Sequence, residues 1–344
     1  MNKIAVFLGA ALIAIIGAFF LFQDEKEVMT AGKSDKLKVG FVYLTNPGDH
    51  GWTYAHEVGR QQLQKHFGNK IETTFVENVP EGPDAARVIR DLVAQDNKVI
   101  FTTSFGYMEP TLKVAKEYPD VMFDHITGYK RAPNMATGNI RFYEGRYVQG
   151  VVAGLTTKSN TIGYLGAFPI PEVIRGINAF ATGVQEVNPD ATVEVVWTFT
   201  WFGPEEETQA ANALIETGVD VLAQHQDSPS TGVVAEANGA KWISYNTVYG
   251  QEAAPEAFVG APVWDWGPYY VDVVNSIIND EFAGGSYWGG METGLVSWYE
   301  EQGTIDGAVS GDIRSKVLAM IAGEFDPPII EEEFIDNIIG TVSP

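Results

Sequence analysis

The sequence predicts an α/β protein of two Rossmann-like lobes that are joined by several hinge crossovers. Short β-branched apolar runs alternate with amphipathic segments of helical length, which is the pattern of βαβ units in a parallel sheet. The alternation restarts near the middle of the chain, and late strand and helix pairs have no sheet of their own to join. A chain of 344 residues is long enough for two ordinary domains.

The first half of the chain predicts one open sheet. Its strand candidates are 38–44 (KVGFVYL), 72–78, 98–104 and 122–128, with helix candidates near 53–67, 83–95 and 109–117. A strand at 139–142 then leads into a helix from Tyr143 to Leu155.

The second half repeats the pattern. Its strand candidates are 161–167, 192–198, 219–225 and 240–246, separated by helix candidates at 172–187, 204–217 and 229–238. Two successive open sheets imply two lobes, because one sheet of that size would be unusual.

Two late strand and helix pairs follow, one within 256–282 and one made of 294–301 with a helix at 307–323. Because these pairs must join the earlier sheets, we expect the chain to cross between the lobes more than once. Lobes joined by several crossing strands hinge around a cleft, as in type I periplasmic binding proteins.

These elements predict a division of the chain into five parts. We expect a signal peptide or signal-anchor at 1–22, a polar tether at 23–36, an N-terminal lobe of 37–140 plus 266–292, a C-terminal lobe of 141–265 plus 293–326, and a C-terminal tail at 327–344.

The N-terminus predicts export from the cytoplasm. A short positive region ending at Lys3 precedes an uninterrupted apolar run, 4–22, which is typical of an export signal and also long enough to span a bilayer. Whether the segment is cleaved stays open. Because the chain has no cysteine, disulfides, thiol catalysis and a lipid-modified N-terminal cysteine are excluded. We therefore expect a periplasmic or extracytoplasmic protein that is not a lipoprotein. It is either soluble or tethered to the membrane by the apolar segment.

Charge and motifs exclude several functions. Lys and Arg total 22 against 45 Asp and Glu, and a net charge of −23 disfavours nucleic-acid binding. The chain contains no nucleophile elbow, zinc-protease helix, Walker loop or complete dinucleotide fingerprint. Its five histidines do not fall at helical metal spacing. We therefore expect no catalytic residues, no metal and no cofactor.

Aromatic residues gather at the C-terminal ends of the predicted strands, where ligands bind in open α/β sheets. They are Trp52, Phe105, Tyr107, Trp201, Phe202, Trp264 and Trp266. One such ring is more often packing than ligand contact, but several in equivalent positions of both lobes favour a ligand. Opposed rings would close on a flat ligand, and each stack contributes about 1–3 kcal/mol for a nucleobase-like partner.

Polar residues beside these rings are candidates for recognising the edge of that ligand. Asp49 and Asp227 offer acceptors for ring N–H or amino donors, Asn246 offers a donor and an acceptor, and Asp265 lies between two tryptophans. Asp49 and Asp227 could instead cap the helices that follow, and Asn246 could hold a turn. Acids beside an aromatic cleft favour a neutral or donor-rich ligand over a phosphate.

At these residues the chain resembles the basic membrane protein family of ABC-transporter substrate-binding proteins, particularly its purine-binding branch. The resemblance extends from Lys38 to about Pro327. It rests on an ordered set of segments that includes GDHGWTYAHEVGR, NIRFYEGRYVQGVVAG, IGYLGAFPIPEVIRGINAFATGVQEVNPD and WDWGPYY. The set is specific for the family and less so for the ligand.

The resemblance implies a two-lobed extracytoplasmic receptor that captures a purine and presents it to a membrane permease powered by an ATPase, and we expect it to be a monomer. By this mapping Trp52 and either Trp201 or Phe202 form the two sides of a sandwich. The family's nucleoside-binding pattern has Phe-Asn where this chain has Trp52-Thr53, and a ribose-binding lysine where it has 263–266 (VWDW). These departures favour a free base such as adenine or hypoxanthine over a nucleoside. A nucleoside-acting periplasmic enzyme and a ligand-sensing receptor for a membrane signalling partner remain as alternatives.

Overall fold

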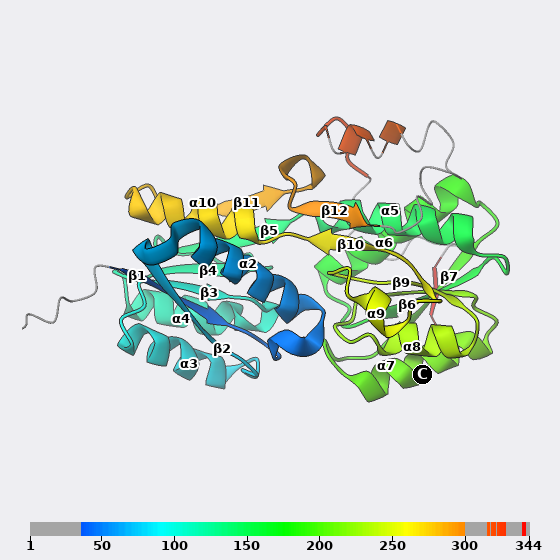
Figure 1. Ribbon diagram of the computed structural model, residues 1–344, viewed down its shortest axis with the longest axis horizontal. Helices are drawn as coiled ribbons and strands as arrows, with labels where there is room; N and C mark the ends of the chain where they lie inside the picture. Colours follow the sequence, from blue (N-terminus) through cyan, green and yellow to red (C-terminus); the bar gives the residue numbers. More distant parts are fainter. Residues whose placement is uncertain (1–35, 300–314, 317, 321, 328–338, 342–344) are drawn as a thin grey trace, which may run out of the picture. The chain divides into compact units, whose positions relative to one another are not determined.

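The computed structural model describes residues 36–299, 315–316, 318–320, 322–327 and 339–341 (Figure 1). The residue contacts separate two compact units of the chain, with the boundary between Lys36 and Leu37. Both sheets belong to the second unit, which begins at Leu37. The expected signal, nearly all of the expected tether and most of the expected helix at 307–323 lie outside the described residues. Within the described part of the chain, no helix is long and apolar enough to cross a membrane.

The N-terminal lobe is a six-stranded sheet whose pairings are all parallel. In spatial order its strands are β11 (Ser286–Gly289), β5 (Met135–Ile140), β4 (Met122–Ile126), β3 (Val99–Thr102), β1 (Leu37–Val42) and β2 (Ile71–Val76). Helices α2 (Trp52–Phe67) and α10 (Gly267–Ile278) cover one face, and α3 (Pro83–Ala94) and α4 (Met108–Glu117) cover the other (Figure 1). Short 3-10 turns are η1 (Pro47–Asp49), η2 (Gly68–Lys70) and η3 (Phe105–Tyr107).

The C-terminal lobe is a seven-stranded sheet that is parallel except where β10 pairs with β12. Its spatial order is β12 (Val296–Tyr299), β10 (Phe258–Trp264), β9 (Lys241–Ile243), β8 (Val221–Gln224), β6 (Thr161–Gly166), β7 (Thr192–Trp197) and β13 (Ile339–Thr341). Its helices are α5 (Phe142–Thr156), α6 (Pro171–Val187), α7 (Pro204–Glu216), α8 (Ser230–Ala237) and α9 (Gly250–Ala253), and the turn η4 is Met291–Thr293.

The chain crosses between the lobes three times, from β5 into α5, from β10 into α10, and from β11 through η4 into β12. The predicted α/β fold with two lobes and multiple crossovers is confirmed. The segment 327–344, expected as a tail, contributes β13, in which Ile339 pairs with Val193 of β7. A strand of three residues is too short to give an apolar pattern in the sequence.

Strands and helices bury the residues that their sequence periodicity selects. Val39 and Phe41 of β1 are fully buried beneath α2 and α10. On the opposite face, α3 begins at a proline in its first turn and buries a stripe of residues spaced three and four apart, Ala85, Val88, Ile89 and Leu92.

Helices α5 and α6 pack closely in the C-terminal lobe, because a glycine on α5 leaves room for the other helix. A Cβ atom at Gly150 would lie 1.9 Å from the carbonyl oxygen of Phe180, which is far inside van der Waals contact. This packing fixes α6 against α5 and thereby holds the first turn of α6, which contains Glu172, in place.

Candidate functional site

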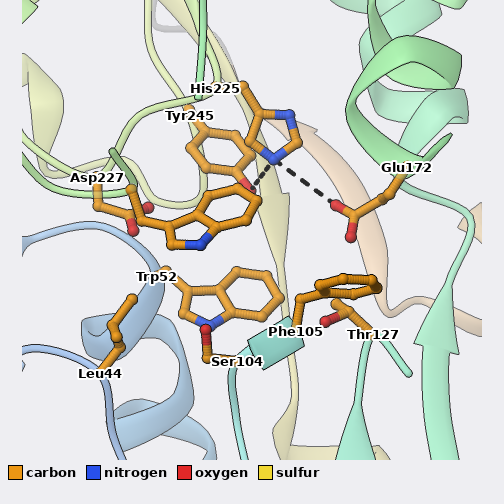
Figure 2. Close-up of a pocket in the computed structure, with 10 residues that line it drawn as sticks. Leu44, Trp52, Ser104, Phe105, Thr127, Glu172, His225, Asp227 and Tyr245 are labelled. Carbon is orange, nitrogen blue, oxygen red and sulfur yellow. Dashed lines mark hydrogen bonds and ion pairs between the residues drawn. The ribbon is translucent and has the colours of Figure 1, made fainter. Parts of the chain in front are cut away.

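A cavity lies where loops from the two lobes meet at the C-terminal ends of their strands (Figure 2). The N-terminal lobe lines it with Leu44, Trp52, Ser104, Phe105 and Thr127, and the C-terminal lobe lines it with Glu172, Trp201, His225, Asp227 and Tyr245. Each of these residues follows a parallel strand of its own lobe, in the region where open α/β sheets bind ligands.

Trp52 is the first residue of α2 and belongs both to the cavity wall and to the core. Its side chain is 8% exposed, and its indole N–H donates to the carbonyl oxygen of Thr103 at the end of β3. The ring meets His56 edge-on at 4.4 Å between centroids and Trp266 at 5.7 Å. These contacts fix the orientation of the ring, so that its remaining surface can face a ligand without further ordering.

The glycine before Trp52 allows the two lobes to approach each other. A Cβ atom at Gly51 would lie 2.6 Å from the carbonyl oxygen of Asp227. The short stretch DHGW therefore combines a residue without a side chain, where the lobes meet, with a ring at the cavity wall.

Other rings form the rest of the apolar lining. Trp201 follows β7 and packs against Phe168 at 5.1 Å between centroids and against His225 at 6.0 Å. Phe105 belongs to η3, and the centroid of its ring lies 6.5 Å from that of the Tyr129 ring. Figure 2 shows Trp52 and Phe105 on one side of the cavity, with Tyr245 and His225 on the other.

Glu172, His225 and Tyr245 form a polar group on the wall of the C-terminal lobe. The Nε2 atom of His225 lies 3.2 Å from the hydroxyl of Tyr245 and 3.6 Å from a carboxyl oxygen of Glu172. Burial lowers the pKa of His225 well below its usual value, so the imidazole is neutral. Burial also raises the pKa of Glu172 to about 6.

A buried guanidinium stands behind this polar group. Arg146 of α5 is fully buried and lies 4.1 Å from the centroid of the Tyr245 ring. Its Nη1 atom donates to the carbonyl oxygen of Gln224 at 2.8 Å and to Gln149 at 3.0 Å. The positive charge lowers the pKa of His225, in addition to the effect of burial, and partly opposes the effect of burial on Glu172.

Asp227 and Asn246 lie side by side after β8 and β9. The side-chain nitrogen of Asn246 donates to the carboxylate of Asp227 at 3.3 Å, and the side-chain oxygen of Asn246 is buried without a hydrogen-bond partner in the described structure. The backbone of Asn246 is left-handed, with φ of 67°. Asp227 lines the cavity, whereas Asn246 lies behind it.

The structure brings together four of the residues predicted to bind a ligand, namely Trp52, Phe105, Trp201 and Asp227. Phe202 is 37% exposed and outside the lining. Asp265 accepts a hydrogen bond from the backbone N–H of Gly267 at 3.1 Å and so forms a turn just before α10, whose N-cap residue is Trp266. Asp49 ends η1, and its side chain is not among those that the structure describes.

The expectation that Trp264, Trp266 and Tyr107 face the cleft is wrong. Trp264 and Trp266 are 3% and 0% exposed and pack into the core around Phe142. Tyr107 is also fully buried, and its hydroxyl donates to the carbonyl oxygen of Val79. A position just after a strand does not by itself distinguish rings that face the cleft from rings that support the loops from behind.

Sequence reasoning missed the remaining lining residues, Leu44, Ser104, Thr127, Glu172, His225 and Tyr245. Each follows a strand in the same way as the predicted residues do, and this position was the signal that could have found them. Glu172 is the first residue of the helix predicted at 172–187 and was not considered as a ligand contact, and His225 was considered only as a metal ligand.

Comparisons with known proteins agree with this geometry. A family model described as ABC transporter substrate-binding protein PnrA-like, the Bmp family, matches residues 36–325. A purine-binding protein of Brucella abortus is 49% identical over 77% of this chain and 76% of its own length. A putative ABC transporter glucose-binding protein of Haloferax volcanii is 41% identical over 83% of this chain and 72% of its own length.

A solved structure shares the fold at low identity. The solute-binding protein of an ABC transporter system from Aeropyrum pernix superposes with a TM-score of 0.72 and 17% identity, over 85% of this chain and 94% of its own. The matching family is one of substrate-binding proteins rather than enzymes, and such proteins bind small molecules outside the cytoplasm. The chain therefore belongs to the Bmp family of PnrA-like ABC transporter substrate-binding proteins.

Proposed function

We propose that the protein binds a purine, as a free base or nucleoside, in the cavity between its lobes and delivers it to the permease of an ABC importer. The observation that carries this proposal is the lining of the cavity, in which Trp52 and Phe105 of one lobe and Trp201 and Tyr245 of the other surround one space. A flat heterocycle offers a π-face to such rings, and each stack is worth about 1–3 kcal/mol.

The charges around the cavity favour a neutral ligand. Glu172 and Asp227 are the acids of the lining, while the nearby guanidinium of Arg146 is buried beneath the Tyr245 ring and does not line the space. A phosphate would meet carboxyl groups without a facing cation, and like charges at short range disfavour binding. We therefore expect adenine, hypoxanthine or their nucleosides to bind more tightly than nucleotides.

The name of the Brucella abortus relative supports a purine ligand, whereas the name of the Haloferax volcanii relative points to glucose. A sugar is the second candidate, because tryptophan rings and carboxylates also suit its apolar face and hydroxyl groups. Two stacking walls from opposite lobes favour a ligand that is flat on both faces. The purine is the better fit on this ground.

The remaining parts of the proposal concern the setting of the protein. We infer that it is exported by its N-terminal apolar segment, that it acts as a monomer, and that its closed form docks on the permease. Closure around the ligand would change the relative position of the lobes, which is the signal that a membrane partner can recognise.

Mass spectrometry of the small molecule that co-purifies with the protein tests the ligand. Titration with adenine, hypoxanthine, guanosine, adenosine monophosphate and glucose, followed by tryptophan fluorescence, then ranks affinities. We expect micromolar or tighter binding of a purine base or nucleoside and weaker binding of the nucleotide and of glucose. A folded protein that responds to glucose and to no purine would contradict the proposal.

A pair of variants links the binding to the cavity. Trp201→Ala should weaken purine binding by about tenfold or more, because it removes one stacking wall. Phe202→Ala is the matched control, since the neighbouring ring lies outside the lining. Equal losses from both variants would show that the loop as a whole, rather than the Trp201 ring, determines affinity.

A further inference from the structure

Glu172 is a lining acid whose carboxyl group makes no hydrogen bond within the described structure. It is the second residue of α6, and its side chain is 14% exposed at the cavity wall. Its recorded polar contact in the described structure is His225, whose Nε2 atom lies 3.6 Å from the carboxyl oxygen, beyond hydrogen-bond distance. The carboxyl group is therefore available to a ligand.

The groups around Glu172 do not hold its carboxyl group in one protonation state. His225 is neutral and lies within hydrogen-bond distance of the Tyr245 hydroxyl, so it supplies no positive charge. Burial raises the pKa of Glu172 to about 6, while the positive charges of Arg175 and Arg146 oppose this effect only in part. Arg175 lies over the rings of Tyr143 and Trp288, at 5.8 and 5.0 Å from their centroids.

Two further titratable groups, Asp227 and Tyr164, lie in or near the cavity. Asp227 is the second acid of the lining, and Tyr164 is a buried phenol whose pKa burial raises to about 12. The N-terminal lobe lines the cavity with Leu44, Trp52, Ser104, Phe105 and Thr127, none of which titrates near neutral pH. A change in the protonation state of Glu172 near pH 6 therefore changes the charge of the cavity.

A carboxyl group presents two different hydrogen-bonding patterns. The neutral acid offers one O–H donor beside one acceptor, whereas the carboxylate offers two acceptors. A 6-aminopurine such as adenine presents an amino donor beside a ring-nitrogen acceptor, which matches the neutral acid. A 2-amino-6-oxopurine such as guanine presents a ring N–H beside an amino donor, which matches the carboxylate. The wrong pairing leaves a buried polar group without a partner, and this penalty gives polar sites their selectivity.

We propose that Glu172 determines which purine edge the cavity accepts, selecting 6-aminopurines when it is protonated and 2-amino-6-oxopurines when it is ionised. The inference rests on the proposed purine-binding function and adds to it a selectivity that reverses with pH. Stacking on the aromatic rings of the lining does not depend on this proton, so we expect the change to affect which base is preferred more than whether a base binds.

Isothermal titration of the full chain with adenine and with guanine, between about pH 5 and about pH 8, tests the inference. Adenine affinity should fall by up to about tenfold per pH unit above about pH 6, and guanine affinity should rise toward neutral pH. Glu172→Gln keeps a donor and an acceptor at every pH. It should retain adenine binding with a flat pH profile and lose guanine binding by about tenfold or more.

Glu207→Gln is the matched control. Glu207 is a buried acid of the same lobe whose pKa is raised to about 7 mainly by burial, but it lies outside the cavity lining. Its replacement should leave the preference between the bases and its pH dependence unchanged. If the control shifts the preference as much as Glu172→Gln does, the inference is overturned.

The failure of this inference is distinguishable from failure of the proposed function. A folded wild-type protein that binds neither base at any pH overturns both. A wild-type protein that binds a purine with the same base preference at all pH values, and in Glu172→Gln, overturns the role of Glu172 alone. Circular dichroism of each variant ensures that only folded protein is compared.

Discussion

The two lobes are held together beside the cavity by a contact that we call the rim contact, made by His50 and Tyr54 of one lobe and Thr247 and Tyr249 of the other. The Tyr249 ring meets Tyr54 edge-on at 4.7 Å between centroids and an angle of 70°, and it lies 5.8 Å from the His50 ring. The hydroxyl of Thr247 donates to the carbonyl oxygen of His50 at 2.5 Å. These interactions exist only while the lobes are in contact, so Tyr249→Ala should destabilise the closed form.

The size of the effect follows from the geometry. An aromatic pair contributes about 0.5–1.5 kcal/mol beyond its buried area, and the 37% exposure of Tyr249, which leaves part of the ring in contact with solvent, places it no higher than the middle of that range. Tyr249→Ala should therefore cost about 1 kcal/mol, or about fivefold in affinity. Adding Thr247→Val removes a neutral hydrogen bond worth about 1 kcal/mol and should bring the loss to about 30-fold.

Stopped-flow tryptophan fluorescence with the ligand that co-purifies measures this prediction. The loss should appear mainly as faster dissociation, because the contact forms only when the lobes close. The thermal melting of the ligand-free protein should change little. Phe75→Ala is the control, since Phe75 is 39% exposed and stacks on Tyr43 within one lobe. Equal dissociation rates for Tyr249→Ala and Phe75→Ala would refute the reasoning.

Two further predictions concern buried residues. Burial raises the pKa of Asp124 to about 7. Between about pH 4 and about pH 7 the folded protein therefore holds a proton on Asp124 that the unfolded chain has released. For this reason the free energy of unfolding should fall as the pH rises through this range. Asp124→Asn keeps an acceptor for the Tyr269 hydroxyl at 2.7 Å and should raise the free energy of unfolding at about pH 8 by about 2–4 kcal/mol, whereas an unchanged denaturation curve would contradict this assignment. Trp52→Ala should cost about 3–5 kcal/mol of stability because the ring is part of the core, while Trp201→Ala should lower affinity with a smaller change in melting; equal melting losses would show that both rings serve packing alike.

The fold could be predicted from the sequence because its elements carry strong local patterns. Strands such as β1 and β6 are short apolar runs, and helices such as α3 and α6 repeat apolar residues at helical spacing, so the sheet-and-helix alternation was visible. The strand β13 was missed because its pairing with β7 depends on a distant partner and not on a pattern of its own. Pairing between segments far apart in the chain is a tertiary property.

The sequence predicted residues of the candidate site through one signal, their position just after a predicted strand. Trp52 and Trp201 were found because a large ring just after a strand is unusual in a loop. Trp266 occupies a similar position but is fully buried and packs against Trp52, because α10, which begins just after it, packs beside α2. Glu172 and His225 were missed, since their approach to one cavity depends on how α6 and β8 are placed in three dimensions.

The two walls of the cavity differ in chemistry, and this difference determines how the ligand specificity of the cavity can change. The wall from the N-terminal lobe consists of a leucine side chain, aromatic rings and hydroxyl groups, whereas Glu172, His225 and Asp227 all lie on the C-terminal wall. Substitutions on the N-terminal wall can alter the area that a ligand buries, but they leave the hydrogen-bonding pattern of the opposite wall unchanged. Because polar mismatch discriminates between ligands of similar shape far better than apolar contact does, a change of ligand within this family should follow substitutions on the C-terminal wall.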